Sequence, residues 1–127
     1  MRQLIEGPLR RTAEGYEVAV RFDWYRSLPL SCVFVSLAVD GQAVPEEHVR
    51  FHVNDCDYAL DELAELHDEF WFVLDAARLR VTPAQPLAPG EHDVQLDITL
   101  RIPYLFDEET GDVLTLYSKP RASLALA

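Results

Sequence analysis

The side chains of this sequence that could act as acids, bases or metal ligands are mostly carboxylates, joined by only four histidines and two cysteines. The histidines are His48, His52, His67 and His92. No two of them at such a spacing as i, i+2 or i, i+4 are joined by a carboxylate in ligand register, so the sequence supports no zinc site. The sequence also lacks a Gly-x-Ser-x-Gly elbow, a phosphate-binding glycine loop and a dinucleotide fingerprint. It therefore indicates no self-sufficient active site.

Two acidic segments are the remaining candidates for metal binding. Asp55, Asp57, Asp61 and Glu62 suggest a calcium site, but the central glycine and the register of an EF-hand are absent. Residues 107–112 are typical of an exposed hairpin turn. We interpret both segments as solvated loops and expect no metal ion on this chain.

An independent enzyme would need an acid–base pair, for which His92 with Asp93 or Glu91 is the available combination. Adjacent residues of a strand point to opposite faces of the sheet, so these groups cannot act together on one substrate. We therefore expect no catalytic residue on this chain.

The charge balance restricts the class of partner. The 127 residues include 22 acidic and 11 basic side chains, a formal net charge of −11. This balance argues against binding to nucleic acid or to an anionic membrane surface, both of which require a basic face. The N-terminal residues lack the apolar core of a signal peptide. We expect a single-domain cytoplasmic protein in which Cys32 and Cys56 are reduced thiols and do not form a disulfide.

Most of the chain alternates between apolar and polar residues with a period of two, which is typical of half-buried strands. The clearest case is 91–101, where Val94, Leu96, Ile98 and Leu100 share one face that continues at Ile102. Further strands are predicted at 16–23, 32–39, 48–54, 70–74, 78–82, 113–117 and 122–126. Residues 32–39 are apolar on both faces apart from Ser36, which predicts a central, covered strand.

Only residues 58–67 have a helical pattern, and they predict at most one short helix. About eight strands without alternating helices indicate an all-β fold. We predict one domain over residues 1–127, an antiparallel β-sandwich, with a small barrel as the alternative.

The connection at residues 24–31 is unusual because it reads Trp-Tyr-Arg-Ser-Leu-Pro-Leu-Ser. Connections usually run over the surface and are polar, whereas this one has the composition of an interface hot spot. Either it is a docking surface, or it folds back as a lid on the chain's own core.

Two other segments place bulky residues on both faces of a strand. They are Phe70-Trp71-Phe72 and, after Pro103, Tyr104-Leu105-Phe106. Since monomers rarely leave a large apolar patch open, we expect these segments to be covered by another protein. The alternative for Phe70-Trp71-Phe72 is a strand sandwiched between two layers.

Several motifs occur in order along nearly the whole chain. They are Gly15-Tyr16, Arg21, Trp24-Tyr25-Arg26-Ser27-Leu28-Pro29-Leu30-Ser31, Asp40-Gly41, Trp71, Leu87-Ala88-Pro89-Gly90-Glu91-His92 and Arg101-Ile102-Pro103-Tyr104. The most specific part is the stretch from Tyr25 to Ser31, followed by a strand and Asp-Gly. Together these motifs resemble the small β subunit of bacterial C-glycoside deglycosidases.

The resemblance implies a non-catalytic subunit. In that family a larger barrel-shaped α subunit carries a divalent metal, usually manganese, and the acid–base residues. The complex cleaves the carbon–carbon bond between a 3-oxo-sugar and a flavonoid-type aglycone. The 3-ketone acidifies the proton on C2, and loss of that proton permits elimination of the aryl group.

On this view the present chain is a β-sandwich that stabilises and shapes the α subunit of a hetero-oligomer. The residues expected at the partner interface are Trp24, Tyr25, Arg26, Leu28, Leu30, Trp71 and Tyr104. The alternative function is a stand-alone carbohydrate-binding module, whose exposed Trp and Tyr rings would stack on sugars.

Overall fold

The structure, a computed structural model, describes residues 4–24, 26–106 and 108–126. These residues form strands and a few short 3₁₀ helices. The strands are β1 Ile5–Arg11, β2 Tyr16–Val20, β3 Leu28–Pro29, β4 Val33–Val39, β5 Gln42–Ala43, β6 Val49–Val53, β7 Cys56–Ala59, β8 Phe70–Trp71, β9 Ala77–Val81, β10 Gly90–Phe106, β11 Val113–Ser118 and β12 Arg121–Leu126. The helices are η1 Leu30–Cys32, η2 Glu46–His48 and η3 Leu60–Glu65. The predicted all-β class is confirmed.

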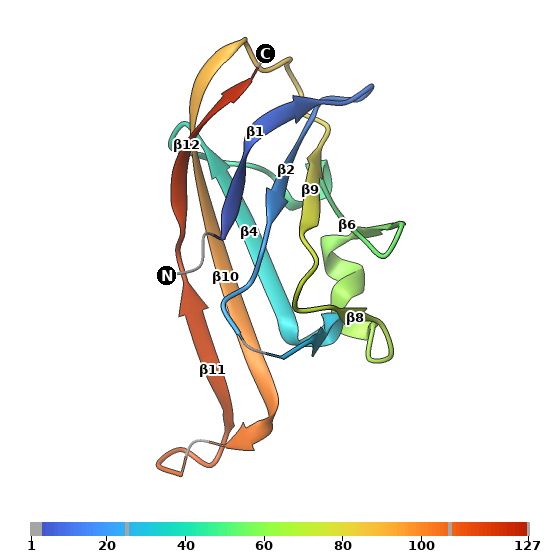
Figure 1. Ribbon diagram of the computed structural model, residues 1–127, viewed down its shortest axis with the longest axis vertical. Coiled ribbons are helices and arrows are strands. Elements are labelled where there is room, and N and C mark those ends of the chain that lie inside the picture. Colours follow the sequence, from blue (N-terminus) through green and yellow to red (C-terminus); the bar gives the residue numbers. More distant parts are fainter. Residues whose placement is uncertain (1–3, 25, 107, 127) are drawn as a thin grey trace.

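The strands form one continuous sheet that curls into a half-barrel (Figure 1). Its order is β5-β4-β10-β12-β1-β2-β9-β6-β7, with β11 beside β10, and β3 pairs separately with β8. The sandwich prediction is therefore confirmed only in its strand content. The two halves of the sheet, β5-β4-β10-β12 with β11 and β1-β2-β9-β6-β7, are hydrogen-bonded to each other and are not separate layers. The join is the β1–β12 pair, which is parallel, so the sheet is mixed and not purely antiparallel.

The irregular strand β1 makes this join possible. Its pairing with β2 shifts register between Glu6 and Arg10, and Leu9 of the same strand lies opposite Leu126 of β12. A β-bulge of this kind bends a strand and increases its twist. The bend allows one strand to serve both halves of the sheet.

The core lies on the concave side of the curled sheet. The five alternating residues of β10 that the sequence predicts to face inward are all buried there. They are Val94, Leu96, Ile98, Leu100 and Ile102. Helix η3 touches both β4 and β6, and its Leu63 is buried, so it closes the open side of the half-barrel. The predicted short helix is thus confirmed, as a 3₁₀ helix over Leu60–Glu65.

Strand β4 differs from its prediction as a covered strand. Leu37 and Val39 are buried, but Phe34 is 44% exposed and Ser36 also faces solvent. No second layer covers the outer face of the sheet at this point in the described part of the chain. The apolar residues on both faces of β4 therefore do not indicate burial on both faces.

The hairpin of β10 and β11 projects from the body of the protein, toward the bottom of Figure 1. Strand β4 pairs with β10 only as far as Leu100, opposite Val33. Beyond that residue β10 pairs with β11, and the register shifts between Ile102 and Phe106. The end of β10 therefore extends past the main sheet.

Candidate partner-binding surface

The connection after β2 is attached to the projecting end of β10. The indole Nε1 of Trp24 donates a hydrogen bond of 2.6 Å to the hydroxyl of Tyr104. The guanidinium of Arg26 lies 5.5 Å from the centre of the Tyr104 ring, within the range of a cation–π contact. Three residues that are expected at the interface, Trp24, Arg26 and Tyr104, therefore form one cluster.

The same connection is attached to the segment around β8. Leu28 and Pro29 pair with Trp71 and Phe70 in the small β3–β8 sheet. Further along, the amide of Val73 donates to Ser27 Oγ at 2.9 Å. The three apolar segments that the sequence singles out, far apart along the chain, thus meet at residues 24–29.

The lid interpretation holds for part of residues 24–31. Leu28, Leu30 and Trp71 have no exposed surface and belong to the chain's own core, as a lid would. The docking interpretation stays a prediction, which now concerns the accessible residues of the predicted set. Trp24 is half-buried, while Arg26 and Tyr104 are exposed. Tyr25 lies outside the described residues.

The segment Phe70-Trp71-Phe72 alternates in and out. Trp71 packs in the core against the rings of Phe22 and Phe51, with centroid distances of 4.6 and 5.2 Å. Phe70 and Phe72 are exposed, so the alternative of a strand sandwiched between two layers is wrong.

The segments that meet at the connection after β2 carry mostly apolar side chains that are exposed or, for Trp24, half-buried. We call this set of residues the apolar end and define it as Trp24, Arg26, Phe70, Phe72, Leu74, Tyr104, Leu105 and Phe106. Leu74 was not expected there; it lies in the turn after β8, which the hydrogen bond from the Asp75 amide to the Phe72 carbonyl closes, and its side chain is 81% exposed. Large contiguous apolar surfaces on soluble proteins usually mark interaction sites.

The buried carboxylate of Glu17 is held by two arginines and stabilises the sheet. It accepts hydrogen bonds from Arg78 at 2.6 Å and from Arg80 at 3.0 Å on the outer face of β2 and β9. Burial raises the pKa of Glu17, but the two arginines outweigh this effect and lower it overall. A carboxylate held ionised in this way is a weak base and cannot serve as a general acid.

His92 is also engaged within the fold. Its Nδ1 donates to Asp40 Oδ2 at 2.6 Å and its Nε2 to the carbonyl of Ala88 at 2.7 Å. The neighbouring acids bind elsewhere, Asp93 to Arg121 and Glu91 to Ser123. The pairs considered for an independent enzyme are therefore not formed.

The His92–Asp40 pair predicts a pH dependence of stability. The hydrogen bond to Asp40 raises the pKa of His92, and the same bond lowers the pKa of Asp40. Because the folded-state pKa of His92 lies above the unfolded value, its contribution is complete below pH about 6.5 and is lost as pH rises through the folded-state pKa. Thermal unfolding followed from pH about 6 to about 9 should show a falling midpoint that is flatter in His92→Gln. Equal slopes in the two proteins would contradict this assignment.

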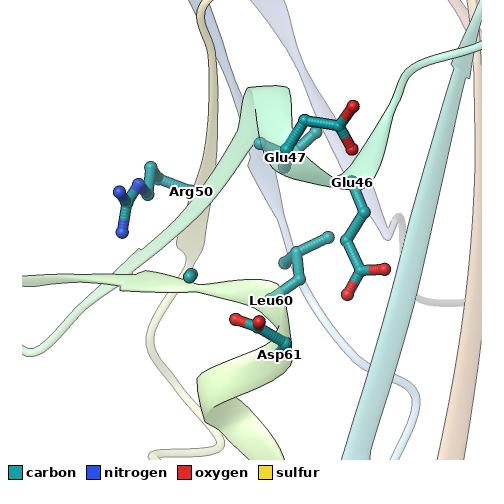
Figure 2. A pocket seen from close by; sticks show the side chains of 7 residues that line it. Glu46, Glu47, Arg50, Leu60 and Asp61 are labelled. Atoms are coloured by element: carbon teal, nitrogen blue, oxygen red, sulfur yellow. The ribbon is translucent and has the colours of Figure 1, made fainter.

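No metal-ligand group occurs in the described ranges: nowhere do three or more His, Cys, Asp or Glu side chains come together in a way that could hold an ion. A cavity of about 300 Å³ that is lined by three carboxylates is shown in Figure 2. The carboxylates of Glu46, Glu47 and Asp61 point in different directions there, beside Arg50 and the apolar Leu60.

Cys32 and Cys56 are free thiols, as predicted. None of the helices among the described residues is long and apolar enough to cross a membrane.

Comparison with known proteins identifies the family. The family model for the C-glycoside deglycosidase beta subunit matches residues 8–104. The chain belongs to this family. A 3'-dehydrocarminate deglycosidase beta subunit of a Microbacterium species is 40% identical over 105 residues, which cover 82% of this chain and 79% of the relative.

Two further relatives carry the description of the family itself. A C-glycoside deglycosidase beta subunit of Microbacterium trichothecenolyticum is 38% identical over 83% of this chain and 80% of its own length. One from Arthrobacter globiformis is 39% identical over 72% and 70%. The resemblance inferred from the motifs is thus confirmed, and the chain is the beta subunit of a C-glycoside deglycosidase complex, which implies an alpha subunit as its partner. The matched range contains every part of the apolar end except Leu105 and Phe106.

Proposed function

We propose that this chain is a non-catalytic subunit that binds a larger barrel-fold α subunit through the apolar end, stabilising it and shaping the rim of its active site. The observation that carries the proposal is that the end of β10 and the segment around β8, both with exposed apolar side chains, are attached to the connection after β2. Exposed apolar surfaces usually mark interaction sites, and a member of a beta subunit family is expected to have an alpha subunit as its partner.

The proposed reaction of the complex is cleavage of the carbon–carbon bond between a 3-oxo-sugar and a flavonoid-type aglycone. One relative is named for a 3'-dehydro compound, which supports an oxidised sugar as the substrate class. The divalent metal, with manganese as the first choice, and the acid–base residues are assigned to the α subunit. This chain's described residues offer no fitting ligand set, so no step of the reaction is assigned to them. The cytoplasm is the proposed location.

Co-expression with a barrel-fold α subunit tests the proposal. The two chains should purify together, and release of aglycone from a 3-oxo-C-glycoside should require both. The control is each chain purified separately and assayed at the same concentration. Turnover by the present chain alone, or failure of the two chains to associate, would refute it.

Membership of a beta subunit family, which implies an alpha subunit as the partner, argues against the stand-alone carbohydrate-binding alternative. One face of the Tyr104 ring is also taken up by the Arg26 guanidinium. Calorimetric titration of the isolated chain with simple sugars and C-glycosides should therefore give no heat of binding. A saturable heat signal would favour the alternative.

A further inference from the structure

Strand β11 (Val113–Ser118) has one open edge. It pairs with β10 on one side and with no other strand of the described residues on the other. Proteins normally protect such an edge with charged residues, proline or a very short strand. The sequence of β11, Val-Leu-Thr-Leu-Tyr-Ser, contains no charge and no proline. The open edge is therefore suited to pairing with another strand.

The alternation of the backbone shows which groups the edge offers. Continuing the β10–β11 register, Leu96 lies opposite Pro120, and the amide of Leu96 donates to the Pro120 carbonyl at 2.9 Å. In an antiparallel pair such bonded positions recur at every second residue. Leu116 and Ser118 therefore bond toward β10, while Thr115 and Tyr117 direct their N–H and C=O groups outward.

The side chains on both faces of β11 could pack against those of a further strand. Leu114 and Leu116 are half-buried and pack against the core on the inner face. On the other face Tyr117 is 75% exposed. A further strand would extend the apolar inner face. On the outer face it would cover part of the Tyr117 ring, which is now in solvent.

Charges of opposite sign flank the two ends of β11. The turn before it carries Glu108, Glu109 and Asp112. After it come Lys119, the one lysine of the chain, and Arg121, which bonds to Asp93. An antiparallel copy of the same strand would place the acidic end of each opposite the basic end of the other.

We propose that β11 pairs antiparallel with β11 of a second copy of this chain, about a two-fold axis at Thr115. In this register Thr115 lies opposite its own copy, and Val113 lies opposite Tyr117, a pairing of β-branched and aromatic residues that stabilises sheets. Leu114 lies opposite Leu116, and Lys119 lies opposite Gly111, beside the acidic turn of the other copy. The contact is isologous and closes after two copies.

A second copy fits this edge better than another protein because the strand complements itself in charge as well as in side-chain pairing. The inference rests on β11 alone and is independent of the proposed function, which uses the apolar end. It holds whether or not the α subunit carries out the proposed chemistry.

Sedimentation of the full chain over a concentration series tests the inference. The wild type should show a mass of twice 14.5 kDa. Thr115→Pro removes the outward N–H at the axis, a position where an edge strand tolerates proline, and should raise the dimer dissociation constant at least about tenfold. Thr115→Val keeps the amide and should dimerise like the wild type. Far-UV circular dichroism checks that each variant is folded.

A charge-swap series provides a second readout away from the strand itself. Lys119→Glu places a negative charge beside the acidic turn of the other copy and should weaken the dimer, whereas the double variant Asp112→Lys, Lys119→Glu, which exchanges the signs at the two ends, should bind more tightly than Lys119→Glu alone. A wild type that is monomeric at every concentration overturns the inference. So does a dimer unaffected by both Thr115→Pro and Lys119→Glu. Loss of α-subunit binding in Thr115→Pro, without any change in the mass of the isolated chain, would assign the edge to that partner instead.

Discussion

Replacing Trp71 with alanine is expected to reduce the free energy of unfolding by about 3–5 kcal/mol, the usual cost of removing a large aromatic side chain from a core. Trp71 has no exposed surface and packs edge-on against Phe22 and Phe51. Its Nε1 also donates to the carbonyl of Asp75 at 2.9 Å. Because domains of this size are stable by only about 5–15 kcal/mol, the variant should lose a large share of its stability and unfold at a clearly lower urea concentration than the wild type. Urea denaturation followed by circular dichroism measures the loss.

Trp71→Phe is the matched control for this experiment. It keeps an aromatic ring in the core but loses the bond to Asp75, so its loss of stability should be clearly smaller than that of alanine. A Trp71→Ala protein with nearly wild-type stability would show that the β3–β8 sheet does not contribute to the core. In that case the support for the apolar end described above would be wrong.

Replacing Tyr104 with alanine should weaken binding to the α subunit by about 2 kcal/mol, which is about 30-fold in the dissociation constant. Tyr104 contacts both Trp24 and Arg26, so its removal disrupts the whole cluster. The side chain is 41% exposed, and the free energy of unfolding should change much less than in Trp71→Ala. Surface plasmon resonance with immobilised α subunit gives the affinity.

Phe34→Ala provides the control for this second prediction. Phe34 is also an exposed aromatic residue, but it lies on the outer face of β4 and outside the apolar end. It should bind the α subunit like the wild type. Equal losses in Phe34→Ala and Tyr104→Ala would mean that the interface is not centred on the apolar end. Wild-type affinity in Tyr104→Ala, Trp24→Ala and Arg26→Ala would exclude this surface altogether.

The sequence predicts the strands whose local pattern is regular and misses those whose pattern is not. In β10 the alternation from Val94 to Leu100 identified both the strand and its buried face. Strand β1 was not predicted, because Gly7 and Pro8 are signals against a strand. Its parallel pairing with β12 joins residues more than a hundred positions apart, and no local pattern encodes such a contact. For this reason the half-barrel could not be distinguished from a sandwich.

The same limit applies to the candidate surface. Composition was enough to select residues 24–31 and the aromatic triplets, since bulky side chains on both faces of a strand cannot all enter one core. Which leucines of the connection turn inward was not predictable, because an irregular backbone has no period to follow. Outside the apolar end, the exposure of Tyr117 on β11 could have been predicted, since this residue alternates with the inward-facing Leu114 and Leu116.

The position of β12 affects how the protein is made. This strand lies between β10 and β1, so it holds together two halves of the sheet that are built earlier in translation. While residues 121–126 are still in the ribosome, the halves cannot join, and the edges of β1 and β10 remain available for mispairing. Folding is therefore completed only after the ribosome has released these residues, and long-range pairing of this kind is slow. A partner synthesised nearby would shorten the time for which the nascent subunit is at risk of aggregation.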